Sequence, residues 1–232
     1  MKISTVLFDL DGTLLPLDQK KFTEECFNQM HKKLAPRGYS MDDLYDCMKA
    51  MTSNDGTKTN KQALLARVFE IRGEKFEREQ HLFDEFYADN FDIIKNVCGF
   101  NSRANEVVKK LKEKGYVVAI ATNPLFPRVA TEKRIKWAGL DVTDFDLVST
   151  YEEFHYSKPD VRFYEEFVQK LNIKPEECLM VGNDAVEDMI AEKIGMKVFL
   201  LTDCLLQDDK VDVSKFSRGD FDKLLEFVDK NL

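Results

Sequence analysis

The sequence predicts an α/β fold, in which a parallel β-sheet is covered by helices on both faces and an all-helical segment is inserted near the N-terminus. Three observations predict it. Short apolar runs of strand length recur along the chain, amphipathic stretches separate them, and residues 17–96 hold no strand-like run. Short buried strands that alternate with helices are typical of parallel sheets, because each crossover places a helix on one face.

Five apolar runs are the expected strands, at 3–8, 116–121, 145–149, 178–181 and 197–201. The helices expected to cover them follow amphipathic patterns at 101–114, 126–138, 160–172 and 185–194. A last amphipathic stretch, 217–232, is expected to close the chain as one helix. Together these elements predict a Rossmann-like core of three layers, α/β/α.

Residues 17–96 repeat apolar side chains at helical spacing in four groups, which predicts an insert of about four helices directly after the first strand. The groups centre on Phe22 to Leu34, Met41 to Met51, Leu64 to Phe69, and His81 to Ile94. Their Phe and Met side chains are expected to form a core of the insert. The predicted organisation is therefore a core domain of residues 1–16 and 97–232 and a helical cap domain of residues 17–96.

Composition limits the classes of function. The formal net charge of −8 argues against nucleic-acid binding, because a phosphate backbone would be repelled. It allows a small phosphorylated substrate, since one metal ion and one lysine can reverse the local charge. The five cysteines are odd in number and widely spaced, and no apolar run reaches transmembrane length. A cytoplasmic protein with no membrane partner is expected; the oligomeric state stays open.

Two carboxylates follow the first strand. Asp9 and Asp11 are separated by one residue, so they project the same way from an extended chain, and Gly12 permits the sharp turn after them. Two like charges held together repel, and a hard cation such as Mg²⁺ would compensate. A solvated Asp-rich turn is the alternative reading. In parallel sheets, ligands bind beyond the carboxyl ends of the strands, so the other strand ends matter.

The other strand ends carry matching chemistry. Thr122 and Asn123 follow the second strand, where a hydroxyl and free backbone N–H groups suit an anionic oxygen. Lys158 precedes the helix expected near 160–172 and offers a point charge for phosphate. The fourth strand runs into the acidic stretch 182–188. Taken singly, each has an ordinary alternative: a turn before proline, a surface lysine, or a helix cap formed by the acidic stretch.

These residues occur in the order of the four motifs of the haloacid dehalogenase superfamily, which the chain resembles over nearly its whole length. Residues 8–14, FDLDGTL, match the first motif fully, and the other three motifs resemble Thr122-Asn123, Lys158-Pro159 and residues 182–188. The helical insert is similar to the C1 cap of the phosphoglycolate phosphatase-like branch. The resemblance implies a Mg²⁺-dependent phosphatase that hydrolyses a small phosphorylated metabolite.

The resemblance also implies roles for the site residues. Asp9 would attack phosphorus and form an aspartyl-phosphate, and Asp11 would protonate the leaving alcohol and then activate water. Thr122, Asn123 and Lys158 would hold the transferring oxygens.

The metal site departs from the family pattern at one position. Mg²⁺ would be held by Asp9, the Asp11 carbonyl and an acid of the fourth motif. Asn183 follows Gly182 where the family has Asp. Either Asp184 takes the metal-facing place with Asp188 in support, which we favour, or Asn183 keeps it and Asp188 supplies the charge.

Two other functions remain open at this point. A phosphomutase would pass the phosphoryl group from Asp9 to a sugar, and a catalytically idle binding protein could use the same fold. A polar stretch at residues 52–60 of the insert is either a solvated connection or a loop that touches the substrate through Asn54 or Lys58.

Overall fold

A single parallel β-sheet forms the centre of the structure, which is a computed structural model describing residues 2–231. Within this range, six strands pair in the order β3-β2-β1-β4-β5-β6, all of them parallel. The strands are β1 Thr5–Phe8, β2 Val117–Ile120, β3 Leu147–Val148, β4 Cys178–Gly182, β5 Lys197–Leu201 and β6 Ser217–Gly219. The predicted α/β class is confirmed, and each of the five expected strands is found.

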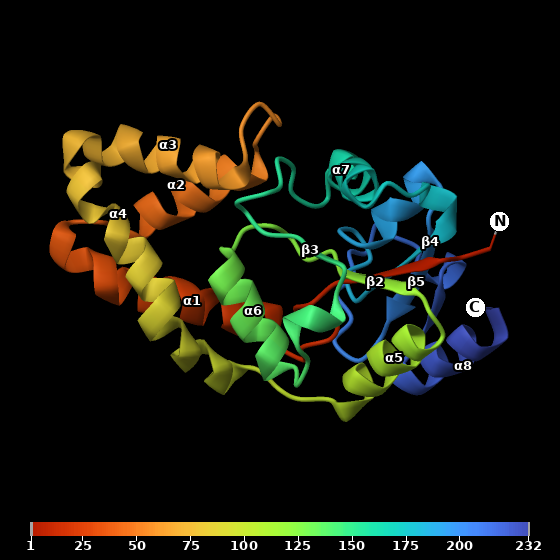
Figure 1. The fold of residues 1–232 in the computed structure, drawn as a ribbon. Coiled ribbons are helices and arrows are strands. Elements are labelled where there is room, and N and C mark those ends of the chain that lie inside the picture. The colour runs from red at the N-terminus through yellow and green to blue at the C-terminus, as the bar shows by residue number, and fades with distance from the viewer. Residues whose placement is uncertain (1, 232) are drawn as a thin grey trace.

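Neighbouring side chains of the strands point into two separate hydrophobic clusters, one on each face. Phe8 belongs to the cluster covered by α5 (Ser102–Glu113) and α8 (Phe221–Asn231), and Leu7 belongs to the cluster under α7 (Val161–Leu171). Figure 1 shows α5 and α8 on one side of the sheet and α7 on the other. This is the predicted three-layer arrangement, and burial of both faces explains the continuous apolar runs of the strands.

The tail differs from the prediction of one helix over residues 217–232. Ser217–Gly219 forms the edge strand β6, which pairs in parallel with β5, and α8 begins only at Phe221. The Asp220 side chain accepts a hydrogen bond from the Lys223 backbone N–H at 2.9 Å, which caps the helix at that point. The strand was missed because it spans three residues and contains no apolar run.

The expected helix over residues 185–194 is also wrong in its first half. Only Met189–Ile194 is helical, as a 3₁₀ helix, and turns occupy the residues before it. The Asp184 carboxylate accepts hydrogen bonds from the backbone N–H groups of Val186 (2.7 Å) and Glu187 (2.9 Å). The Asp184 side chain thus accepts hydrogen bonds that backbone carbonyl groups would accept in a helix.

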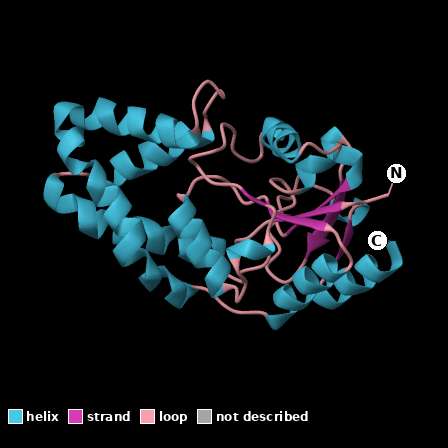
Figure 2. Cartoon of the chain, in the orientation of Figure 1, coloured by secondary structure: helices cyan, strands magenta, loops and turns pink. Residues whose placement is uncertain are grey.

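The insert between β1 and β2 is entirely helical, as predicted. It contains α1 Gln19–Leu34, α2 Met41–Thr52, α3 Asn60–Arg72 and α4 Phe76–Glu85, followed by a π-helical turn, Phe86–Asn90, and a 3₁₀ helix, Phe91–Val97. The fourth helix therefore starts before the expected group at His81 and ends within it. Figure 2 shows these helices on one side of the molecule and the strands on the other.

The insert has two apolar regions. Side chains of α2, α3 and α4, with Leu34 at the end of α1 and Tyr39, form a second cluster, which also contains Tyr151 from the loop after β3. Phe22 of α1, together with Phe86 and Phe91, belongs instead to the large cluster that lies against the sheet. The base of the insert is therefore packed as part of the sheet's own hydrophobic core.

The two chain segments that lead into and out of the insert are paired with each other. Leu17 and Cys98 form an isolated antiparallel bridge, and the Gly99 N–H donates to the Pro16 carbonyl oxygen at 2.6 Å. Entry and exit therefore leave the core as one linked pair.

A second attachment lies at the start of α3, far from this pair in sequence. The buried Asn60 side chain donates through Nδ2 to the Pro124 carbonyl oxygen and to the Ser157 hydroxyl, both at 3.0 Å. Its Oδ1 accepts from Nδ2 of Asn54 at 2.9 Å, and its backbone N–H donates to the Phe154 carbonyl oxygen at 2.8 Å. Asn60 thus joins the insert to the loops that follow β2 and β3.

We expect Asn60→Ala to lower the free energy of unfolding by about 1–3 kcal/mol, because buried partners such as the Pro124 carbonyl lose a hydrogen bond. The matched control is Lys58→Ala, whose exposed side chain makes no hydrogen bond within residues 2–231; it should change stability by less than about 0.5 kcal/mol. Urea unfolding followed by the fluorescence of the single tryptophan, Trp137, measures both. Equal stability of the two variants would contradict this role for Asn60.

Two further properties of the described residues concern the cysteines and the length of the helices. All five cysteines have free thiols, so no disulfide forms among them. None of the helices within residues 2–231 is long and apolar enough to cross a membrane.

Candidate active site

The carboxyl ends of β1, β2 and β4 meet at one edge of the sheet because these strands are neighbours in it. Asp9 continues β1, where its N–H donates to the Val181 carbonyl oxygen at 2.9 Å. A cavity of about 90 Å³ opens at this edge. Its lining residues are Asp9, Asp11, Gln19, Thr122, Asn123, Asn183, Asp184, Glu187, Asp188 and Leu206. The structure therefore brings six of the seven predicted site residues into one cavity.

Lys158, the seventh, is buried next to the cavity and bridges two of its acids. Its Nζ lies 3.0 Å from Oδ1 of Asp9 and 2.6 Å from Oδ1 of Asp188. Lys158 is 3% exposed and Asp188 is 1% exposed. Burial lowers the pKa of Lys158, but the Asp188 and Asp9 carboxylates outweigh it and hold that pKa well above its usual value. Lys158 is therefore a fixed positive charge between two carboxylates.

Asp11 has a partner that the sequence did not reveal. Its Oδ2 forms an ion pair with Nη1 of Arg134 on α6 (Arg128–Trp137), and Arg134 is fully buried. Burial raises the pKa of Asp11 to about 6, although the Arg134 charge opposes the rise. Oδ1 of Asp11 is buried and accepts no hydrogen bond within residues 2–231. Asp11 thus has one oxygen held by Arg134 and one oxygen available.

Asn123 and Thr122 reach the cavity from the end of β2. Asn123 donates through Nδ2 to Oε2 of Glu187 at 3.1 Å and to the Lys158 carbonyl oxygen at 3.3 Å. The Thr122 carbonyl oxygen accepts a hydrogen bond from the Ser149 hydroxyl at 2.6 Å, which fixes its backbone. The predicted anion-holding pair is therefore tied on one side to the acidic loop and on the other to the loop after β3.

The acidic loop separates the roles of Asn183 and Asp184. Asn183 uses both ends of its amide: Oδ1 accepts from the Thr13 hydroxyl at 2.8 Å, and Nδ2 donates to the Cys204 carbonyl oxygen at 2.8 Å. It also packs against Gly12, where φ is +82° and an added Cβ would lie 2.4 Å from Asn183 Nδ2. Asp184 uses only Oδ1 in capping, and its Oδ2 accepts no hydrogen bond within the described residues.

The cavity has an excess of negative charge. Five of its ten lining residues have carboxyl groups; Lys158 pairs with two of them, Asp9 and Asp188, and Arg134 pairs with a third, Asp11. Burial raises the pKa of Glu187 and that of Asp188 to about 7, since both carboxyls lie in a poorly solvated place. No group of three or more His, Cys, Asp or Glu side chains within residues 2–231 is arranged to hold a metal ion, and the Lys158 ammonium lies within 3.0 Å of both Asp9 and Asp188. The oxygen-rich, acidic donor set nevertheless fits a hard divalent cation.

Four lining or contacting residues were not predicted as site residues: Arg134, Glu187, Gln19 and Leu206. Arg134 lies with Ala130 on the buried face of α6. A charged residue at a position where an amphipathic helix normally has an apolar one was the signal that could have indicated a site residue. Glu187 belongs to the acidic stretch whose alternative reading was a helix cap, and its side chain accepts a hydrogen bond from Asn123. Gln19 opens α1 and shows no sequence signal that separates it from a surface residue.

No residue of the polar stretch at 52–60 lines this cavity, although Asn60 at its end contacts Pro124 and Ser157, which follow Asn123 and precede Lys158. Neither Asn54 nor Lys58 lines it. Asn54 donates through Nδ2 to the His155 carbonyl oxygen at 2.8 Å and to the Lys58 carbonyl oxygen at 2.7 Å. These contacts favour the reading of this stretch as a connection.

Known proteins are similar to this chain in sequence. The model of one family, described as haloacid dehalogenase-like hydrolase, matches residues 6–201. The pyrophosphatase PpaX of Bacillus cereus (strain ATCC 10987 / NRS 248) is 28% identical over 197 residues, which are 85% of this chain and 82% of that protein.

Solved structures share the fold over almost the full chain. A predicted phosphoglycolate phosphatase from Haemophilus somnus 129PT superposes with a TM-score of 0.62 at 20% identity, covering 98% of this chain and 99% of that one. A 2-haloacid dehalogenase from Pseudomonas syringae pv. Tomato DC3000 superposes with a TM-score of 0.64 at 16% identity and the same coverage. At these identities the likeness concerns the fold.

Proposed function

Because this chain belongs to the haloacid dehalogenase-like hydrolase family, we propose that it is a Mg²⁺-dependent phosphatase of small phosphorylated metabolites. The family resemblance drawn from the motifs is confirmed, and the chain is a hydrolase by that membership. One observation carries the proposed reaction. The Asp9 carboxylate lies 3.0 Å from the buried Lys158 ammonium, and a second acid, Asp11, follows two residues later and lines the same cavity.

The proposed reaction has two halves. An Asp9 carboxylate oxygen bonds to phosphorus while the ester P–O bond breaks, and Asp11 gives its proton to the leaving alkoxide. Asp11 then removes a proton from a water molecule that attacks the aspartyl-phosphate, which releases phosphate and restores Asp9. The free Oδ1 of Asp11 supports this assignment, because proton transfer needs an oxygen that no other group holds.

The remaining side chains hold charge and geometry. Lys158 keeps the Asp9 carboxylate in place and offsets the charge of an arriving phosphate. Thr122 and Asn123 are proposed to contact the transferring oxygens from the end of β2. Arg134 holds the second oxygen of Asp11 and so fixes the direction of its proton.

The residues that would hold Mg²⁺ are Asp9, the Asp11 carbonyl and Asp184, with Asp188 in support. The free Oδ2 of Asp184 supports this choice over Asn183, whose amide oxygen already accepts a hydrogen bond from the Thr13 hydroxyl. When bound, the ion would neutralise negative charge shared by the carboxylates and the phosphate.

We also propose the organisation and the location expected from the sequence. Residues 17–96 would act as the cap over a core of residues 1–16 and 97–232, and the protein would be cytoplasmic. The separate cluster of α2, α3 and α4 supports the first proposal, and the five free thiols support the second.

The experiment that tests the function is a panel of phosphorylated compounds assayed for phosphate release with Mg²⁺. The panel includes pyrophosphate, because a PpaX pyrophosphatase is among the relatives, and a sugar phosphate, because a mutase would isomerise it. Release of phosphate from at least one ester supports the proposal. Isomerisation without net release would point to a phosphomutase, and no reaction on any compound would point to a binding protein.

We expect Asp11→Asn to lower kcat by about 10²- to 10³-fold and to leave KM nearly constant, since proton transfer is lost while the shape of the site is kept. Steady-state kinetics on the best ester of the panel measures this. The control is Asp92→Asn, an exposed aspartate outside the cavity, which should keep wild-type kinetics. A wild-type kcat for Asp11→Asn would rule out the assigned acid-base role.

A further inference from the structure

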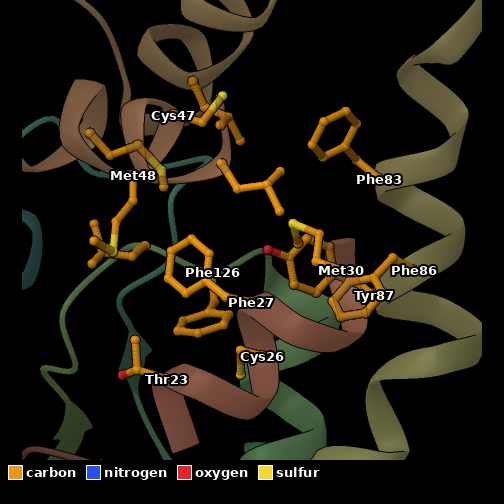
Figure 3. A pocket seen from close by; sticks show the side chains of 14 residues that line it. Thr23, Cys26, Phe27, Met30, Cys47, Met48, Phe83, Phe86, Tyr87 and Phe126 are labelled. Carbon is orange, nitrogen blue, oxygen red and sulfur yellow. The ribbon is translucent and has the colours of Figure 1, made fainter. Parts of the chain in front are cut away.

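A second cavity of about 90 Å³ lies in the helical insert (Figure 3). Its lining is apolar, whereas the lining of the first cavity is acidic and polar. Its fourteen lining side chains come from α1 to α4, from the π-helical turn and from the loop after β2. None of them is charged. Apart from the hydroxyls of Thr23 and Tyr87, they present carbon and sulfur, with aromatic rings such as Phe27 and thioethers such as Met30 and Met48.

One wall of this cavity comes from the loop after β2, which also supplies two residues of the candidate active site. Phe126, which lines it, lies in the loop that begins with Thr122 and Asn123. The Arg134 guanidinium lies 4.3 Å from the centre of the Phe126 ring and is paired with Asp11 on its other side. The apolar cavity is therefore separated from the proton-donating acid by one arginine and one aromatic ring.

Cys26 on α1 gives a second indication that the cavity lies near Asp11. Burial raises the pKa of this thiol, and the charged groups that act on it most strongly are Arg134 and Asp11. Cys26 lines the apolar cavity on α1. Two walls of the cavity thus lie within electrostatic reach of Asp11.

We propose that this cavity binds the organic group of the substrate and that this group is apolar, such as a single aromatic ring or a short alkyl chain. The proposal rests on the phosphatase function above and names its substrate class: phosphate monoesters of apolar alcohols. The ester would place its phosphate at Asp9 and its carbon chain past Phe126. Hydrolysis consumes one water and releases phosphate and the alcohol, which keeps the proton from Asp11.

Volume and polarity support this class over polar ones. Apolar cavities of this order of size take up benzene-sized groups. A sugar or a second phosphate placed here would lose its hydrogen bonds to water and find only the Thr23 and Tyr87 hydroxyls in exchange. Such unpaired burial is costly. Pyrophosphate is therefore expected to be a poorer substrate than an apolar ester.

The first test compares benzyl phosphate with methyl phosphate, since both release a primary alcohol of similar acidity and differ mainly in the ring. We expect kcat/KM to be roughly 10- to 100-fold higher for benzyl phosphate, the gain given by burial of one phenyl ring. Pyrophosphate is expected to fall below benzyl phosphate. Equal values for the two esters, or a preference for pyrophosphate, would overturn the proposal.

A pair of variants on α2 places the effect in the cavity. Met48 is half-buried and lines it, whereas Ala50 is half-buried on the same helix and does not. We expect Met48→Asp to lower the benzyl-to-methyl ratio of kcat/KM at least tenfold, because a carboxylate in the cavity opposes an apolar ring. Ala50→Asp should keep the wild-type ratio, and Met48→Leu should restore most of it. An unchanged ratio in Met48→Asp would overturn the proposal.

Direct binding separates this proposal from the phosphatase function. Calorimetry measures the affinity of the wild-type protein for benzylphosphonate and methylphosphonate, which have no ester bond to hydrolyse. Tighter binding of benzylphosphonate supports the proposed role of the cavity. If no ester is hydrolysed in the same preparation, only the phosphatase function is contradicted. Equal binding of both, alongside measurable phosphatase activity, would overturn the cavity proposal and leave the function standing.

Discussion

Asp9→Asn is expected to lower kcat by at least about 10⁴-fold with every phosphate ester that the protein hydrolyses. A carboxamide has the shape of the carboxylate but cannot attack phosphorus, so the first bond never forms. The fold should persist, because Lys158 keeps its 2.6 Å contact with Asp188. Phosphate release under saturating substrate measures the loss, and the melting temperature reports the fold.

The matched control for this variant is Asp42→Asn, which makes the same chemical change at an exposed position in the first turn of α2. It should retain wild-type turnover. Retention of wild-type hydrolysis by Asp9→Asn would show that another group attacks the phosphate. An unfolded Asp9→Asn protein would be replaced by Asp9→Glu, which keeps the charge and should still lose most activity because the longer side chain misplaces the attacking oxygen.

Removal of the metal is expected to have an effect of the same order. Activity should fall to background in a chelator and return when Mg²⁺ is added in excess, because the acidic cavity repels a phosphate that carries the same sign of charge. Ca²⁺ should restore only a small fraction, since it prefers longer bonds and more ligands. Phosphate release measured against free Mg²⁺ concentration follows the recovery.

The control is the same chelator saturated with Mg²⁺ beforehand, which should leave activity at its starting value. An Asp184→Asn variant should need a higher Mg²⁺ concentration for half-maximal activity, because it loses the free carboxylate oxygen of the acidic loop. Activity that persists in chelator would contradict the magnesium site, and it would leave the Asp9 chemistry to be explained by Lys158 alone.

The strands and the convergence of their ends were predictable because both follow from local patterns. A buried parallel strand must be apolar on both faces, and the carboxyl ends of neighbouring strands must meet. Asp9, Thr122, Asn123, Asp184 and Asp188 accordingly line one cavity. Their chemical roles remain predictions.

The parts that were missed depend on contacts between distant segments. Arg134 and Asp11 are 123 positions apart, and no pattern within either segment indicates that they pair. Strand β6 forms only because β5 offers its edge, since its own residues carry no apolar alternation. The turn at Asp184 was read as a helix because propensity does not show that a side chain will replace the backbone acceptors.

The two attachments of the insert restrict how it can move. One is the paired entry and exit at Leu17 and Cys98, and the other is the buried Asn60 with its bonds to Pro124 and Ser157. A rigid body held at two points can only rotate about the line that joins them. Separation of the start of α3 from the loops after β2 and β3 must break the Asn60 bonds and also the Asn54 bond to the His155 carbonyl oxygen, so opening by detachment costs more than rotation about this axis.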